Sequence, residues 1–244
     1  MKGVILAGGR GTRLRPITEI INKHLLPVGS YPMIYWSIFK LKEAGISDIL
    51  ILTNKEHLSS FIQLLRNGEP FEVNINYKIQ DGSAGIADAL SYAKSFVKDD
   101  KFIVLLGDNV FEDSLISYIE AYQKQSKGAR VLLKEVNETE CYGIAVLNED
   151  QKKISTIVEK PKEWISPYCV TGIYMYDKQV FKIIDKIKPS ERGELEITDV
   201  NNQYAQLNAL YFDVLDGWWI DAGTYESLYK ASSHINYKLK NDMN

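Results

Sequence analysis

The residues best suited to chemistry form a glycine loop near the N-terminus, Leu6–Arg13, with the sequence Leu-Ala-Gly-Gly-Arg-Gly-Thr-Arg. Glycines after a buried strand let backbone N–H groups approach a polyphosphate with no Cβ in the way. Arg13 can then neutralise charge with its guanidinium fork. The loop lacks the Gly-Lys-Ser/Thr of a Walker A motif and the third glycine of a dinucleotide fingerprint. On spacing alone, an ordinary tight turn remains the alternative to a phosphate site.

Local charge favours a small anionic ligand. The chain of 244 residues has a net charge of -3, which argues against a general nucleic-acid-binding protein. The first 24 residues nevertheless concentrate cations around the glycine loop, with a single carboxylate among them: Lys2, Arg10, Arg13, Arg15, Lys23 and Glu19. A solvated basic face would not need the glycines. The combination indicates a small polyanion bound at one place.

Two carboxylates follow predicted strands. Asp108 comes directly after an apolar run, in Gly-Asp-Asn, and Asp221 lies between an aromatic strand and a helix. Carboxylates at strand ends are suited to hold Mg²⁺ beside phosphates, and two from separate strands can share one ion. For each residue considered alone, a turn-forming aspartate is the alternative. Thr224 is the better candidate for the cap of the helix that follows Asp221.

Alternating strand and helix patterns predict an α/β fold with a mixed, mostly parallel sheet. The expected strands cover 2–7, 48–53, 73–79, 101–106, 130–136, 143–147, 154–158, 168–176 and 210–214. The expected helices cover 32–44, 55–66, 85–97, 178–187, 197–206 and 224–239. Ligands bind beyond the carboxyl ends of parallel strands, which is where the glycine loop and Asp108 fall. The closely spaced later strands predict a small antiparallel lobe that holds a second substrate.

Bulk properties limit the class of protein. Hydrophobic residues make up 45% and charged residues 25%, and no linker or repeat divides the chain, so one domain over 1–244 is expected. Neither a signal-peptide pattern nor a membrane span is present, and a cytoplasmic protein is expected. The two cysteines, Cys141 and Cys169, are expected to be reduced, packed thiols.

Taken together, these segments resemble the sugar nucleotidyltransferases, most closely the short-form glucose-1-phosphate thymidylyltransferases. Nine matching segments follow one another in the family's order: 6–16, 22–35, 80–89, 105–111, 142–145, 159–162, 168–177, 192–204 and 219–228. The resemblance implies a Rossmann-like three-layer fold, with a nucleotide-binding half near 1–110 and a sugar-phosphate-binding half near 111–244. It also implies a homo-oligomer and a role in dTDP-sugar synthesis.

The resemblance also implies roles for individual residues. The catalytic set is Arg13, Lys23, Asp108 and Asp221, the last two as ligands of Mg²⁺. The nucleotide-binding set is Leu6, Ala7, Gly8, Gly9, Gly11, Thr12, Arg13, Gln80, Gly85 and Asp108, in which Gln80 reads the base. The sugar-phosphate set is Gly143, Glu159, Lys160, Val170, Tyr174 and Arg192. Alone, Lys23 and Lys160 would pass as surface lysines.

The implied reaction is attack by glucose 1-phosphate on the α-phosphorus of dTTP, which gives dTDP-glucose and pyrophosphate. The nucleophile is already an anion at neutral pH, so no general base is required, and His24, His57 and His234 are expected to be surface or packing residues. UTP or another sugar 1-phosphate remains an alternative, since one methyl group is worth only about 1–3 kcal/mol in a fitted pocket. A non-catalytic nucleotide sensor is the alternative of another class. A glycosyltransferase is disfavoured because Asp108-Asn109-Val110 lacks a second aspartate.

Three departures from the long members of the family bear on these expectations. The segment 80–85 lacks a proline that long members carry near the base site. Pro167 replaces an asparagine, which puts one sugar-side contact in doubt. The sequence ends soon after the last predicted helix, without the extra C-terminal helices that help build the tetramer and the regulatory nucleotide site of long members, so tetramer geometry and feedback control stay open.

Overall fold

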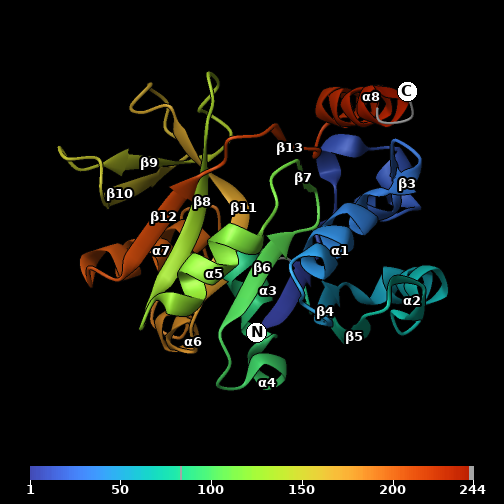
Figure 1. The fold of residues 1–244 in the computed structure, drawn as a ribbon, viewed down its shortest axis with the longest axis horizontal. Coiled ribbons are helices and arrows are strands. Elements are labelled where there is room, and N and C mark those ends of the chain that lie inside the picture. The colour runs from blue at the N-terminus through green and yellow to red at the C-terminus, as the bar shows by residue number, and fades with distance from the viewer. Residues whose placement is uncertain (83, 242–244) are drawn as a thin grey trace.

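The computed structural model describes residues 1–82 and 84–241, which form three layers around one mixed sheet (Figure 1). Ser83, part of the departure at 80–85, lies outside the described residues. One half of the sheet is parallel, in the order β6-β1-β4-β5. These strands are β1 (Lys2–Leu6), β4 (Asp48–Thr53), β5 (Asn74–Ile79) and β6 (Phe102–Leu106). The expected α/β class is confirmed.

The other half of the sheet is organised by one long strand, β11 (Tyr168–Tyr176). This strand runs antiparallel to β6 and β8, and it touches β9 at a single register pair, Cys169 with Ile144. The hairpin of β9 and β10 projects from this half (Figure 1), which matches the expected antiparallel lobe. The remaining strands here are β8 (Ala129–Glu135), β9 (Gly143–Leu147), β10 (Ile154–Glu159) and β12 (Leu210–Val214).

Alternation along β1 shows how the sheet separates two cores. Val4 and Leu6 face one hydrophobic cluster, and Ile5 faces the other. The first cluster is covered by α3 (Ile86–Ser91), α4 (Lys94–Val97), α6 (Gln179–Ile184) and α7 (Ile197–Gln206). The second is covered by α1 (Met33–Glu43), α2 (Leu58–Leu65) and α5 (Ile116–Lys124). Strands buried on both faces read as continuous apolar runs, which is why they were readily predicted.

A third, smaller core joins the C-terminal helix α8 (Tyr225–Asn241) to two short ribbons. One ribbon pairs β2 (Pro27–Val28) with β3 (Tyr31–Pro32), and the other pairs β7 (Asn109–Phe111) with β13 (Trp219–Asp221). Thr224 caps α8 as expected, because its Oγ1 accepts a hydrogen bond from the Ser227 N–H at 3.1 Å. The helix therefore supports the ribbon that contains Asp221 and directly follows Asp108.

The sequence patterns missed several elements. Helix α5 was not predicted because it buries only Ile119 and Tyr122, too few to make a periodic stripe. The predicted helix 85–97 is two shorter helices, α3 and α4. The ribbon β7–β13 went unpredicted as a pair because its strands are far apart in sequence, and β2–β3 because each of its strands has only two residues. Short 3₁₀ turns fall at Thr12–Leu14, Ile17–Glu19, Lys23–Leu25, Lys55–His57 and Glu69–Phe71.

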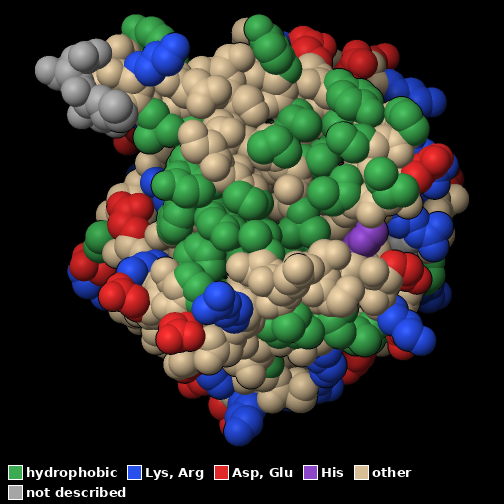
Figure 2. Space-filling model, turned by 90° about the vertical axis from the view of Figure 1, so that its right-hand side faces the viewer, with side chains coloured by type: hydrophobic (Ala, Val, Ile, Leu, Met, Phe, Trp, Pro, Cys, Tyr) green, Lys and Arg blue, Asp and Glu red, His purple; other side chains and the backbone are tan. Residues whose placement is uncertain are grey.

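One face of the molecule is distinctly apolar. Figure 2 shows hydrophobic side chains gathered over the side formed by α8, β3 and α2, with charged groups mostly around the rim. A shallow groove on the molecule is lined by Leu25, Pro32, Ser60, Gln63 and Leu64. Over the described residues, no helix has both the length and the hydropathy needed to cross a membrane.

Candidate active site

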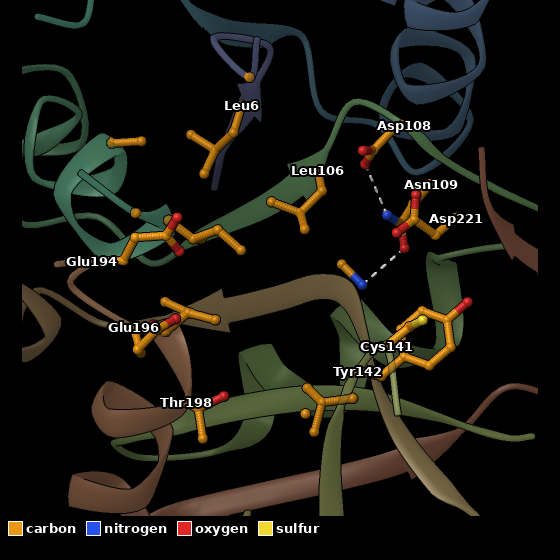
Figure 3. Close-up of a pocket in the computed structure, with 18 of the residues that line it drawn as sticks. Leu6, Leu106, Asp108, Asn109, Cys141, Tyr142, Glu194, Glu196, Thr198 and Asp221 are labelled. Carbon is orange, nitrogen blue, oxygen red and sulfur yellow. Dashed lines mark hydrogen bonds between the residues drawn. The ribbon is translucent and has the colours of Figure 1, made fainter. Parts of the chain in front are cut away.

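A cavity of about 460 Å³ lies at the carboxyl ends of β1 and β6, beside β11 and the antiparallel lobe. Figure 3 shows Asp108, Asn109 and Asp221 on one side of it and Glu194, Glu196 and Thr198 on the other. We call the first side the glycine-loop end (residues 8–13 with Lys23, Asp108 and Asp221). The second is the carboxylate-rich end (Glu159, Lys160, Arg192, Glu194 and Glu196).

The glycine loop is held by hydrogen bonds to its backbone. Asn22 Nδ2 donates to the Ala7 carbonyl at 3.0 Å, and Thr18 Oγ1 donates to the Gly11 carbonyl at 2.7 Å. Gly11 has φ of 61°, in the left-handed region that glycine tolerates. A Cβ on Gly8 would collide with the side chain of Gln80. The glycines therefore serve the packing of the loop as well as its approach to a ligand.

Lys23 and Asp108 form a buried ion pair at the glycine-loop end. Burial alone would raise the pKa of Asp108, but the ammonium of Lys23 holds that pKa well below its usual range. Asn109 Nδ2 adds a hydrogen bond to Asp108 Oδ1 at 3.1 Å. Asp108 is therefore an anion at any physiological pH.

The pairing of β7 with β13 brings the second carboxylate beside the first. Asp221 lies in register with Asn109, and the Ala222 N–H donates to the Asp108 carbonyl at 2.9 Å. Asn109 Oδ1 accepts from the Trp219 indole N–H and from the Gly172 N–H, each at 2.8 Å. The ribbon is thus tied to β11, and the two aspartates are fixed to one rigid unit.

Asp221 is electrostatically unsatisfied. Burial, followed by the nearby charge of Asp108, raises the pKa of Asp221 to about 6. Among the described residues, its buried Oδ1 has no hydrogen-bond partner, and its Oδ2 has a loose ion pair with Arg13 Nη2 at 3.7 Å. Two close carboxylates with an orphaned oxygen are a donor set that suits a hard divalent cation.

Two carboxylates alone would leave part of such a cation's coordination shell to other ligands. Within the described ranges, no group of three or more His, Cys, Asp or Glu side chains is arranged to hold a metal ion. Mg²⁺ is typically held by one or two carboxylates and completes its shell with water and substrate phosphates. Asp108 and Asp221 fit that pattern.

His24 lies under the same end of the cavity but stays neutral. Burial and the charge of Lys23 lower its pKa to about 3, and its Nδ1 lies 2.7 Å from Asn22 Oδ1. A Cβ on Gly107 would approach the imidazole to 2.7 Å, so the ring is tightly packed. The other histidines lie elsewhere, with His234 stacked on Trp218. The expectation of packing roles agrees with these positions.

The carboxylate-rich end is a network centred on Arg192 and Glu159. Thr198 Oγ1 donates to Glu159 Oε2 at 2.6 Å, and Arg192 Nη2 donates to Glu159 Oε1 at 3.3 Å. Lys160 lies beside the same carboxylate, with Nζ 4.0 Å from Oε1. Glu196 also contacts Arg192. At this end two cations, Lys160 and Arg192, therefore lie beside three carboxylates, because Glu194 also forms an ion pair with Arg192.

The structure brings nearly all the predicted residues to this one cavity. The predicted residues that line it are Leu6, Gly8, Gly9, Gly11, Thr12, Arg13, Lys23, Gln80, Gly85, Asp108, Gly143, Glu159, Lys160, Val170, Tyr174, Arg192 and Asp221. Ala7 is the exception, because its side chain is fully buried in the core that α1 and α2 cover. Its contribution to the loop comes through its backbone carbonyl.

Several lining residues were missed: Ile86, Ala89, Leu106, Asn109, Tyr142, Gly172, Glu194, Glu196, Thr198, Asn201 and Trp219 are among them. The segment 194–199 and Asn109, next to Asp108, lie within stretches that match the family, but the sequence does not show which way their side chains point. Cys141 also lines the cavity and is exposed, so the expectation of a packed thiol is wrong for it; Cys169 is buried, and both are free.

Gly85 has a structural role that the sequence did not reveal. Its φ is 106°, and a Cβ would lie 2.5 Å from the Leu195 carbonyl oxygen. The glycine lets the start of α3 approach the strand-like segment before α7, where the Ala87 N–H donates to the same carbonyl at 3.1 Å. A side chain at Gly85 would push the start of α3 away from the backbone of Leu195.

The fold and this cavity define the class of protein. Residues 2–238 match the family model described as nucleotidyl transferase, so the chain belongs to that family and is a nucleotidyltransferase. A glucose-1-phosphate thymidylyltransferase of Neisseria meningitidis is 41% identical over 238 residues, which are 96% of this chain and 82% of that protein.

Solved structures agree with this assignment. A Bacillus anthracis protein assigned as a glucose-1-phosphate thymidylyltransferase, in complex with sucrose, is 50% identical with a TM-score of 0.92, over 97% of this chain and 95% of that one. A UDP-glucose pyrophosphorylase complexed with UDP-glucose is 25% identical with a TM-score of 0.86, over 97% and 98%. The predicted resemblance is confirmed.

Proposed function

We propose that this enzyme transfers a thymidylyl group from dTTP to glucose 1-phosphate, with Mg²⁺, to give dTDP-glucose and pyrophosphate. The observation that carries the proposal is the two-ended cavity, in which a glycine loop with Arg13 and Lys23 lies opposite Glu159, Lys160 and Arg192. The glucose-1-phosphate thymidylyltransferases among its relatives, at about 40% identity over nearly the whole chain, support this choice of substrates.

In the proposed mechanism the protein positions two anions and neutralises their charge. The glycine-loop backbone, Thr12 and Arg13 hold the triphosphate, and Lys23 lies beside the phosphate that is transferred. Asp108 and Asp221 would hold Mg²⁺, which supplies Lewis-acid stabilisation of phosphate oxygens. Apolar Leu6 lines the same cavity as Gln80 and suits the face of a base.

At the carboxylate-rich end, Lys160 and Arg192 receive the sugar phosphate, and Glu159 accepts hydrogen bonds from sugar hydroxyls. Gly143, Val170 and Tyr174 complete the proposed sugar pocket. A phosphate oxygen of the sugar then attacks the α-phosphorus, and the bond from that phosphorus to the bridging oxygen of pyrophosphate breaks. The attacking oxygen is already anionic, so no base is needed, which fits a neutral His24.

The test is pyrophosphate release with Mg²⁺ across four nucleoside triphosphates and several sugar 1-phosphates. The expected result is the highest kcat/KM for dTTP with glucose 1-phosphate. A preference for UTP would support the second candidate, UTP-dependent chemistry, which the UDP-glucose pyrophosphorylase fold similarity favours. No release with any pair would contradict the enzyme activity.

Three broader expectations stay predictions. One is the division into a nucleotide-binding half before about residue 110 and a sugar-phosphate-binding half after it; Asp221 belongs to the second half but lies at the glycine-loop end. A homo-oligomer and a cytoplasmic location also remain to be measured.

A further inference from the structure

The carboxylates around Arg192 differ sharply in how they are held. Glu196 is 10% exposed in its side chain, accepts from Arg192 Nε at 3.2 Å and from Nη2 at 2.9 and 3.0 Å, and also accepts from Ser190 Oγ at 2.7 Å. Glu194 is 42% exposed and reaches Arg192 only through a 3.6 Å ion pair with Nη2. Glu196 is held by several hydrogen bonds, whereas Glu194 has one longer ion pair and a more exposed side chain.

The backbone around Arg192 restricts which of these groups can move. The Ser190 N–H donates to the Glu194 carbonyl, and the Gly193 N–H donates to the Ser190 carbonyl, each at 2.8 Å. Gly193 has φ of 74°, so the chain makes a tight turn that presents Arg192 at its tip. Because this turn is closed by its own backbone hydrogen bonds, the Glu194 side chain can leave Arg192 without breaking it.

The guanidinium retains capacity for an anion. All the contacts above use Nε or Nη2; over the described part of the chain, no hydrogen bond or ion pair engages Nη1. A phosphate prefers to bind a guanidinium through two parallel N–H groups. On the Nη1–Nη2 edge it meets Glu159, which accepts from Nη2 at 3.3 Å, and Glu194, whose only contact with Arg192 among the described residues is the 3.6 Å ion pair. Of these two carboxylates, Glu194 has the longer contact and the more exposed side chain, so it is the easier to displace.

We propose that Glu194 is a displaceable counter-ion that competes with the sugar phosphate for Arg192, and that Glu196 is the positioning residue that keeps the guanidinium aimed into the cavity. This inference rests on the proposed function and adds a control on affinity. A sugar 1-phosphate carries about two negative charges near neutral pH. Entering an end with three carboxylates and two cations, it binds only after Glu194 turns toward solvent.

Removal of the Glu194 charge should therefore strengthen sugar-phosphate binding, which is the opposite of what the loss of an ordinary binding residue does. In E194Q the KM for glucose 1-phosphate falls about two- to fivefold, the range expected for one exposed ion pair, while the KM for dTTP stays unchanged. The gain shrinks as ionic strength rises, because an exposed charge is screened.

Two further variants make the test decisive. E196Q releases the guanidinium and raises the KM for glucose 1-phosphate about tenfold or more, with a smaller effect on the KM for dTTP. E191Q removes an exposed carboxylate from the same turn that does not line the cavity, and its kinetics stay like the wild type. If E194Q matches E191Q, or raises the KM, the counter-ion role is wrong.

A binding measurement separates this inference from the proposed function. If the wild-type enzyme releases no pyrophosphate with any substrate pair, the proposed function fails, and calorimetric titration of the same proteins with glucose 1-phosphate then decides. Tighter binding by E194Q than by wild type and E191Q supports the counter-ion role. Equal affinity, or no binding by wild type and E194Q alike, overturns it.

Discussion

The glycine-loop end of the cavity has more cations than carboxylates among its lining residues: Arg10, Arg13 and Lys23 against Asp108 and Asp221. The carboxylate-rich end reverses the balance: Lys160 and Arg192 against Glu159, Glu194 and Glu196. Both ends are proposed to bind phosphate. The difference shows that affinity for an anion depends on how each cation is already engaged, as well as on how many are present.

The cations at the two ends are paired with carboxylates in different ways. Lys23 is committed to Asp108 in a buried pair, while Arg13 is 55% exposed and only loosely associated with Asp221. Arg192 is committed to Glu196 and shared with Glu159 and Glu194. A highly charged triphosphate suits the end with spare positive charge. A sugar, with many hydroxyls to place, suits the end rich in hydrogen-bond acceptors.

The largest effect should come from the carboxylates of the glycine-loop end. Asp108→Asn or Asp221→Asn should lower kcat at least about 100-fold, because either change weakens the proposed metal site. Steady-state pyrophosphate release measures the loss, and circular dichroism checks that the fold is intact. Asp216→Asn changes an exposed aspartate outside the cavity and is the matched control. Near-normal turnover in both site variants would sink the metal assignment.

Replacing each of the two arginines, Arg13 and Arg192, by alanine tests whether the two ends bind different substrates. Arg13→Ala should lower kcat/KM for dTTP about 10- to 100-fold, as expected for a charge-assisted hydrogen bond to phosphate. Arg192→Ala should mainly raise the KM for glucose 1-phosphate. Kinetics with each substrate varied at a saturating level of the other separate the effects. If both variants affect the same KM, the two-ended description is wrong.

A stability prediction concerns α8, which supports only the glycine-loop end. Glu112, next to β7, accepts hydrogen bonds from Lys238 Nζ and His234 Nε2. Burial would raise the pKa of Glu112, but the hydrogen bonds from Lys238 and His234 lower it to about 2. Its contribution to folding is therefore complete above the unfolded pKa near 4.5 and is lost as pH falls from there toward 2.

Glu112→Gln should cost on the order of 1–2 kcal/mol of unfolding free energy at pH 7, reduced from the full shift because the carboxylate is partly exposed. The difference from wild type should shrink as pH falls from about 4.5 toward 2. Urea unfolding between pH 7 and pH 3 measures it. Glu226→Gln, which removes an exposed ion pair with Lys230 on the same helix, should stay close to wild type throughout. A pH-independent loss in E112Q would contradict the linkage.

The smallest expected effect is a difference in salt dependence. Raising ionic strength at constant Mg²⁺ should raise the KM for dTTP a few-fold, since screening weakens the net positive end. The KM for glucose 1-phosphate should change less, because salt screens attraction to Arg192 and repulsion from Glu194 together. Parallel salt titrations compare the two slopes, and equal slopes would remove the charge contrast.

Much of the fold could be read from local patterns. Strands such as β1, β4 and β6 are short apolar runs buried on both faces, and these runs identify themselves without any knowledge of their neighbours. The glycine loop and Asp108 follow such strands directly, so their place at the carboxyl edge of the sheet was predictable. By contrast, α5 buries too little apolar surface to make a pattern.

The family, the α/β class and the residue types at strand ends could be inferred from the sequence, because these depend on local spacing. Which charges meet was apparent only in the folded chain. The β7–β13 pairing joins Asp108 to Asp221 across 113 residues of chain, and the turn before α7 puts Glu194 and Glu196 on one guanidinium. Such contacts depend on side-chain direction and on pairing between distant segments, neither of which local sequence encodes.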